Sequence, residues 1–82
     1  MVKLRETIVK EVFMYLNILA EMARRQITKA QMAQKLNMSA WTFDRKLKGE
    51  SSFTVEEIIE IQNVFNDSKC TFEYLFKENQ PA

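Results

Sequence analysis

The stretch Ile27–Leu47, ITKAQMAQKLNMSAWTFDRKL, contains two short amphipathic segments separated by a polar turn. Thr28 begins the first segment and Gln31 follows three residues later, the spacing of a capping box in which each side chain bonds the other residue's backbone N–H. Ser39 precedes the second segment and can cap it. Asn37 lies between them, and asparagine tolerates the left-handed backbone of a sharp turn. The stretch therefore predicts two helices joined by a tight turn.

The spacing of apolar residues gives both predicted helices an inner and an outer side. The residues expected on the inner side are Met32, Ala33, Leu36, Phe43 and Leu47. The residues left at least partly on the outer side of the second helix are Ala40, Trp41, Asp44, Arg45 and Lys48.

Helical patterns also precede and follow this stretch. Residues 2–25 show helical apolar spacing, which predicts either one long helix or two pieces broken near Asn17. Thr54 with Glu57 forms a second capping box before an apolar helix, and Thr71 can cap a last short one. With only one Gly and one Pro, this pattern predicts an all-α fold of about five helices.

The length of 82 residues suits one domain. We expect a single helix-turn-helix domain over residues 1–82, in which residues 28–48 form the helix-turn-helix itself. Residues 1–14 are expected to be an N-terminal extension of the first helix, and residues 77–82 a frayed tail.

The composition excludes several kinds of chemistry. Cys70 is the one cysteine and histidine is absent, which excludes an internal disulfide, the usual zinc sites and Ser–His or Cys–His nucleophilic pairs. We therefore expect no enzymatic activity, cofactor, metal or small-molecule ligand. Because there is no signal pattern and no apolar run of about 18 residues, we expect a cytoplasmic protein without a membrane partner.

Charge is distributed unevenly along the chain. Residues 1–50 contain ten Lys or Arg and five Asp or Glu, whereas residues 51–82 contain two and six. In residues 24–48, seven Lys or Arg accompany Asp44 as the one acidic residue. Such a local positive field suits an anionic polymer such as DNA, although a solvated helical face is the alternative explanation.

The order of these features resembles the lambda-repressor-like, or XRE/Cro-CI, family of helix-turn-helix DNA-binding domains. The resemblance covers roughly 60 residues and depends on an ordered set of short motifs rather than on one diagnostic element. Those motifs are Ile27-Thr28, Met32-Ala33, Leu36-Asn37-Met38-Ser39, Gly49, Thr54-Val55-Glu56-Glu57-Ile58, and Cys70-Thr71 with Leu75-Phe76. The run Thr42–Gly49 is also similar to small prophage-associated regulators.

The resemblance implies a compact five-helix lambda-repressor-like domain whose recognition helix, at about residues 39–48, enters the major groove of double-stranded DNA. The residues at its base-reading places are Ala40, Trp41, Asp44 and Arg45. The residues placed near phosphates are Thr28, Lys29, Ser39, Lys48, Ser51 and Ser52. The implied function is that of a transcriptional repressor of phage or mobile-element type.

Three positions depart from the family pattern. Asn37 replaces the glycine of the turn, and asparagine can still adopt the backbone conformation that the turn needs. Lys29 replaces a residue that is often Gln, which keeps a phosphate contact but removes a hydrogen-bond acceptor. Lys46 replaces an apolar residue, and Leu47 takes over one position later, which rotates the end of the recognition helix. The roles of Lys46 and Lys48 stay open for that reason.

Each site residue also has a structural interpretation. Arg45 can read guanine, but it can equally form a salt bridge or bind a phosphate. Trp41 can contact a thymine methyl or fold onto the domain, and Asp44 can accept from cytosine or orient Arg45. The threonine and serine hydroxyls are helix caps first, and the lysines can serve solubility alone.

Two functions from different classes are therefore open. The first is sequence-specific DNA binding by a homodimer, with the interface at either the N-terminal extension or the C-terminal helix containing Phe72 and Phe76. The alternative is a protein-interaction module that has the fold but does not bind DNA. The modest net charge of +1, Ala40 at a base-reading place and the acidic C-terminal half favour this alternative.

Overall fold

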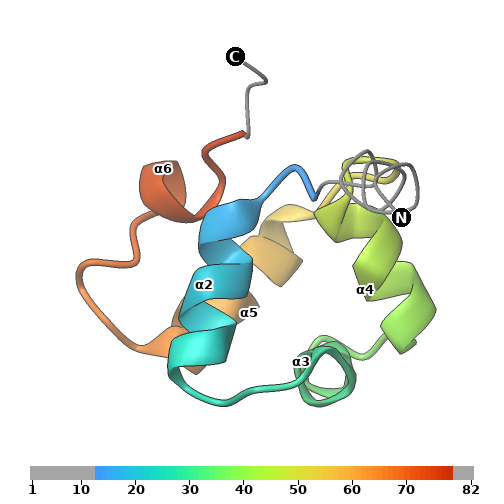
Figure 1. Cartoon of the computed structure of the whole chain (residues 1–82), viewed down its shortest axis with the longest axis horizontal. Coiled ribbons are helices and arrows are strands. Elements are labelled where there is room, and N and C mark those ends of the chain that lie inside the picture. Colours follow the sequence, from blue (N-terminus) through green and yellow to red (C-terminus); the bar gives the residue numbers. More distant parts are fainter. Residues whose placement is uncertain (1–12, 79–82) are drawn as a thin grey trace, which may run out of the picture.

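Five helices follow one another in the part of the chain that the computed structural model describes, residues 13–78. The protein is all-α, as predicted, and no strand occurs within the described residues. Figure 1 shows α4 and α6 toward opposite ends of the longest axis, with α2 between them. The helices are α2 (Leu16–Arg24), α3 (Lys29–Lys35), α4 (Ala40–Leu47), α5 (Val55–Phe65) and α6 (Phe72–Leu75).

Hydroxyl side chains begin four of these helices, as the sequence predicts. Thr28 Oγ1 accepts from the backbone N–H of Gln31 at 3.1 Å, and the Gln31 side chain accepts from the backbone N–H of Thr28 at 2.9 Å. Such caps satisfy backbone donors that have no partner within the helix. The remaining caps are Ser39 on Thr42, Thr54 in a capping box with Glu57, and Thr71 on Tyr74.

Four helices end in a left-handed residue. The positive φ angles are 58° at Gln26 after α2, 65° at Asn37 after α3, 84° at Gly49 after α4 and 48° at Asn66 after α5. After α3, the N–H of Met38 bonds the carbonyl of Ala33 at 3.0 Å, which is the crossed bond of a Schellman motif. Equivalent bonds follow α2 and α4. Asn37 was predicted in this role, whereas Gln26 was not.

Gly49 is required for two reasons. Its φ of 84° strains any residue that has a Cβ atom. In addition, a Cβ at this position would lie 2.6 Å from Cε of Met14. The turn after α4 therefore leaves room for the segment that precedes α2.

That segment is not helical, so of the two alternatives predicted for residues 2–25, one continuous helix is wrong at residues 13–15. The backbone N–H groups of Met14 and Tyr15 donate to the carbonyl of Leu47, at 2.9 and 3.3 Å. These bonds replace helical ones, and the non-helical residues 13–15 lie just before α2, close to the predicted break near Asn17. The predicted N-terminal extension before residue 13, and the tail beyond residue 78, lie outside the described residues.

The core lies where all five helices meet. Every residue predicted for the inner side of the helix-turn-helix is buried there. Around it, the rings of Tyr15, Phe43, Phe53 and Phe76 pack edge to face with centroids 5.3–6.2 Å apart. The buried apolar residues are Ile18, Met22, Met32, Ala33, Leu36, Phe43, Leu47, Ile61, Phe65, Cys70 and Leu75.

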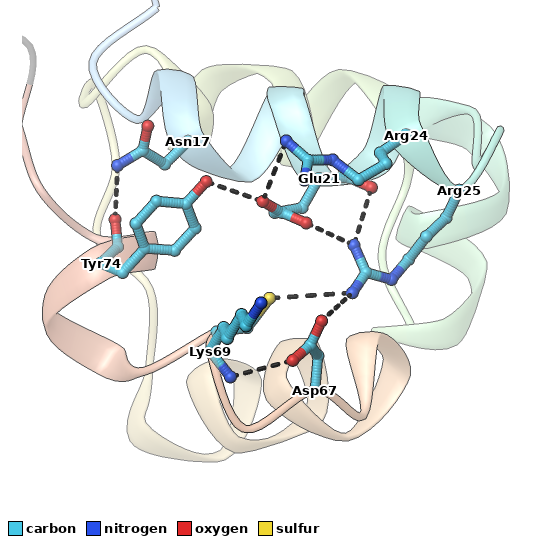
Figure 2. Close-up of polar contacts among 8 residues, drawn as sticks. Asn17, Glu21, Arg24, Arg25, Asp67, Lys69 and Tyr74 are labelled. Atoms are coloured by element: carbon cyan, nitrogen blue, oxygen red, sulfur yellow. Dashed lines mark hydrogen bonds and ion pairs between the residues drawn. The ribbon is translucent and has the colours of Figure 1, made fainter.

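A polar network joins α2 to the last third of the chain (Figure 2). Glu21, which is 5% exposed, accepts from the Tyr74 hydroxyl at 2.7 Å and from Nη1 of Arg25 at 2.6 Å. Arg25 also reaches Asp67 at 3.3 Å, and Asn17 donates to the Tyr74 carbonyl at 2.7 Å. These bonds hold α6 and the preceding loop against α2.

The network determines the ionisation of its members. The hydrogen bonds from Tyr74 and Arg25 lower the pKa of the Glu21 carboxyl. The bond to Glu21 raises the pKa of the Tyr74 hydroxyl, and burial raises that of the Cys70 thiol. At neutral pH the Glu21 carboxylate is therefore charged, and its charge is balanced by Arg25.

Candidate nucleic-acid interface

The two helices predicted around the turn pack directly on each other. Met32 and Ala33 of α3, together with Phe43 and Leu47 of α4, lie in the core. This packing and the left-handed Asn37 fix the angle at which α4 leaves α3. The opposite side of α4 is consequently held outward on a rigid pair of helices.

Trp41 and Arg45 stand out on the outward side of α4. The Trp41 side chain is 67% exposed, and the guanidinium carbon of Arg45 lies 4.9 Å from the centroid of its ring. Arg45 Nε also contacts a carboxylate oxygen of Glu50 at 3.3 Å. Ala40, which directly precedes Trp41, is also exposed. A flat aromatic ring and a stacked guanidinium are thus presented side by side.

Asp44 lies on the same helix but is oriented toward α3. Its Oδ1 accepts from Nζ of Lys29 at 2.7 Å, and its Oδ2 lies 3.3 Å from Nζ of Lys48. The bond from Lys29 is the main cause of the lowered pKa of this carboxyl, so it is charged at neutral pH. The Phe13 ring covers the group, with its centroid 4.1 Å from Nζ of Lys29. The structure therefore joins Lys29, Lys48 and Asp44 in one cluster.

The four hydroxyl residues expected near phosphate are all exposed. The hydroxyls of Thr28 and Ser39 accept cap bonds, and Ser39 also donates to Oγ1 of Thr42 at 2.9 Å. Ser51 and Ser52 lie in the loop after α4, where the Ser52 carbonyl accepts from Nζ of Lys46 at 2.6 Å. Ser39 therefore lies at the start of α4 and Ser51 and Ser52 lie just beyond its end, whereas Thr28 lies at the start of α3.

Lys46 stands at a position where the family pattern has an apolar residue, and the structure shows how the lysine fits there. It is 9% exposed, and its Nζ lies 3.1 Å from a carboxylate oxygen of Glu57 besides bonding the Ser52 carbonyl. Its alkyl stem is buried as an apolar residue would be, while its ammonium reaches polar partners. Lys46 therefore ties α4 to the start of α5, and it is not part of the outward side.

The positive field predicted from the sequence is largely balanced within the fold. Among the described residues, six of the seven cations in residues 24–48 lie within 4.0 Å of a carboxylate oxygen, and Lys35 is the exception. Arg25 and Lys46 belong to the interior rather than to the outward side. Phe13 and Glu50 were missed as members of the site, because their contacts depend on turns whose geometry the sequence does not specify.

Comparisons with protein families, with curated proteins and with solved structures found no match for this chain. Within residues 13–78, no group of three or more Cys, Asp or Glu side chains is arranged to hold a metal ion. In the same part of the chain, no helix has the length and apolar character needed to cross a membrane.

Proposed function

We propose that this protein binds double-stranded DNA in a sequence-specific manner through the outward side of α4. In this proposal it acts as a transcriptional repressor of phage or mobile-element type, related to the lambda-repressor-like family. The proposed location is the cytoplasm.

The observation that carries the proposal is the exposed Trp41–Arg45 pair on the second of two rigidly packed helices. An α-helix fits the major groove, and arginine can donate two hydrogen bonds to guanine O6 and N7. Stacking on Trp41 restricts the Arg45 guanidinium to fewer orientations, which lowers the entropy lost on binding. Trp41 itself offers an apolar surface to a thymine methyl or a sugar.

Contacts to the DNA backbone would flank this pair. In the proposed complex, phosphates lie near Thr28 at the start of α3, near Ser39 at the start of α4, and near Ser51 and Ser52 in the loop after α4. Such contacts fix the register of a protein on the duplex without reading its sequence. Lys29 and Lys48 lie at the same surface, although each is within 3.3 Å of the Asp44 carboxylate in the free protein.

The proposal includes a homodimer, because operators of this kind usually contain two half-sites read by a symmetric pair. Phe72, at 52% exposed, leaves apolar surface on α6. Val55 and Ile59 leave more on α5, at 70% and 50% exposed. Sedimentation equilibrium without DNA tests this part of the proposal: a single species at the monomer mass of 9.7 kDa across micromolar concentrations would contradict it.

Trp41 supplies the assay for DNA binding, because it is the one tryptophan of the chain. We expect mixed-sequence duplex DNA to change its fluorescence and to protect it from acrylamide quenching. The binding should weaken steeply as salt rises from 50 to 200 mM, because phosphate contacts release counterions. Arg45→Ala should weaken binding to a selected site by about 10-fold or more, the range of one bidentate base contact.

Lys69→Ala is the matched control, since it also removes one positive charge. Lys69 is exposed in the loop between α5 and α6, away from α4 in Figure 1. We expect this variant to bind nearly as well as the unchanged protein. Equal losses in both variants would mean that only total charge matters, and an absence of binding at 50 mM salt would overturn the proposal.

The ion pairs favour one alternative, a protein-interaction module that does not bind DNA. Arg45 already has Glu50 as a partner, and most cations near α4 are balanced internally. An exposed tryptophan beside an arginine is also typical of protein interfaces. Failure to bind DNA at low salt, combined with an intact helical fold by circular dichroism, would favour this alternative.

A further inference from the structure

Four side chains from three segments meet at one edge of the candidate interface. Asp44 lies between Lys29 and Lys48, with nitrogen–oxygen distances of 2.7 and 3.3 Å. The Phe13 ring lies against both ammonium groups, with its centroid 4.1 and 5.6 Å from them. Each lysine therefore has an anionic oxygen on one side and an aromatic face on another.

These contacts engage the lysines in the way that a phosphate would. A carboxylate and a phosphate diester each offer a negatively charged oxygen to an ammonium group. The side chains of Lys29, Asp44 and Lys48 are 38%, 26% and 26% exposed, so the contact is partly shielded from water. A DNA phosphate that approached Lys29 would have to displace the Asp44 oxygen or share the lysine with it.

The same geometry argues against Asp44 as a reader of bases. Both of its carboxylate oxygens already have a lysine partner. Accepting a hydrogen bond from cytosine N4 would require Asp44 to give up at least one of these pairs. Asp44 would also repel neighbouring phosphates if it became unpaired.

We propose that Asp44 acts as an internal counter-charge that holds Lys29 and Lys48 and thereby limits the sequence-independent affinity of α4 for DNA. This inference rests on the proposed DNA-binding function and specifies how its affinity is set. The role gives Asp44 a purpose different from base reading: it lets the Trp41–Arg45 pair contribute more of the total binding.

The test compares Asp44→Asn with the unchanged protein on a mixed-sequence duplex at several salt concentrations. The variant keeps the size of the side chain but removes its charge. One lysine freed to contact phosphate should steepen the slope of log affinity against log salt by about 0.9. If the two proteins bind equally at 1 M salt, this difference in slope makes Asp44→Asn bind about 8-fold more tightly than the unchanged protein at 0.1 M salt.

A double-mutant cycle assigns the gain to Lys29. In the unchanged protein, Lys29→Gln should alter the affinity for DNA by less than about 2-fold, because Lys29 is paired with Asp44. In the Asp44→Asn background, the same change should remove most of the 8-fold gain. If Asp44→Asn does not fold, Lys29→Gln alone still decides: a loss of about 0.9 in its salt slope would overturn the inference.

Two controls separate counter-charge from other effects. Glu73→Gln makes the same change in net charge at an exposed position of α6, and it should leave the affinity within about 2-fold. Asp44→Glu keeps the negative charge and should bind like the unchanged protein. An equal gain in either control and in Asp44→Asn would overturn the inference.

The outcomes also separate a failure of the counter-charge role from a failure of the proposed DNA binding. If the unchanged protein binds DNA and Arg45→Ala weakens that binding, but Asp44→Asn gives no gain, the counter-charge role fails and DNA binding stands. If neither the unchanged protein nor Asp44→Asn binds at 50 mM salt, both fail.

Discussion

Removing the hydroxyl of Tyr74 tests the polar network between α2 and α6. Tyr74→Phe keeps the ring but deletes the donor that lies 2.7 Å from Oε2 of Glu21. Among residues 13–78, the cation that would remain within 4 Å of that oxygen is Arg24, at 3.7 Å. Because the Glu21 side chain is 7% exposed, water does not readily replace the lost bond.

A hydrogen bond to a charged group contributes about 1.5–3 kcal/mol to stability. We therefore expect Tyr74→Phe to lower the free energy of unfolding by about 2 kcal/mol at pH 7. At about 4–8 °C per kcal/mol for a domain of this size, the melting temperature should fall by about 8–16 °C. Circular dichroism at 222 nm is the suitable probe, because exposed Trp41 reports little on the core.

The loss of unfolding free energy in Tyr74→Phe should also depend on pH. The pKa of Glu21 is lowered in the folded protein, so its contribution to stability is present above the unfolded value of about 4.3. That contribution is lost as pH falls through the lower folded pKa. Once Glu21 is protonated, the bond to Tyr74 becomes a neutral one worth about 0.5–1.5 kcal/mol. The difference between the unchanged protein and Tyr74→Phe should therefore narrow between pH 7 and pH 2.

Tyr15→Phe is the matched control, since the Tyr15 ring packs edge to face against Phe53 and Phe76. Because phenylalanine keeps this ring packing, Tyr15→Phe should lower the free energy of unfolding by less than about 0.5 kcal/mol. Equal costs for the two tyrosine variants would refute the reasoning. A cost for Tyr74→Phe that does not change between pH 7 and pH 2 would refute the assignment to Glu21.

Three further changes test other parts of the fold by urea unfolding. Asn37→Ala should lower the free energy of unfolding by about 1–2 kcal/mol because φ is 65° at this position, whereas Asn37→Gly should leave it nearly unchanged. Equal losses in the two variants would exclude backbone strain as the cause. Lys46→Met keeps an apolar side chain in the buried position but loses the ammonium contacts with Ser52 and Glu57, so the free energy of unfolding should fall by about 1–2 kcal/mol. A variant at least as stable as the unchanged protein would mean that the ammonium group adds nothing to stability. Thr54→Ala should cost about 1 kcal/mol and Thr54→Ser much less, and a serine variant as unstable as the alanine variant would contradict the capping role.

The helix starts were predictable from the sequence because a cap depends on residues only three positions apart. Thr28, Ser39, Thr54 and Thr71 each accept the bond that this spacing implies. Burial of Phe43 and Leu47 followed from helical periodicity for the same local reason.

Features set by distant partners could not be predicted. Met14 and Tyr15 are compatible with a helix, but their N–H groups bond Leu47 instead. Gln26 escaped prediction for a local reason: glutamine rarely adopts positive φ, yet φ is 58° here, where the N–H of Ile27 bonds the carbonyl of Met22 at the end of α2.

For the candidate site, the sequence located Ala40, Trp41 and Arg45 on the outward side of α4, but not the partners of Arg45 or the turn of Asp44 toward α3. Whether Lys29 is available to a phosphate depends on its 2.7 Å contact with Asp44 across two helices. Likewise, whether Lys46 belongs to the surface depends on the position of the Ser52 carbonyl. Counting charges along the chain therefore overestimates the field that the folded surface presents.

The bonds from Met14 and Tyr15 to the Leu47 carbonyl have a consequence for the smallest unit that can fold. They close a loop containing α2, α3 and α4, so the end of α4 is completed by residues that come before α2. A peptide of residues 27–48 would lack this closure, and its two short helices would be marginal in water. Autonomous folding should therefore require the chain from Phe13 onward. A fragment that starts at Leu16 retains all five described helices but loses these two bonds, so it should be less stable than a fragment that starts at Phe13.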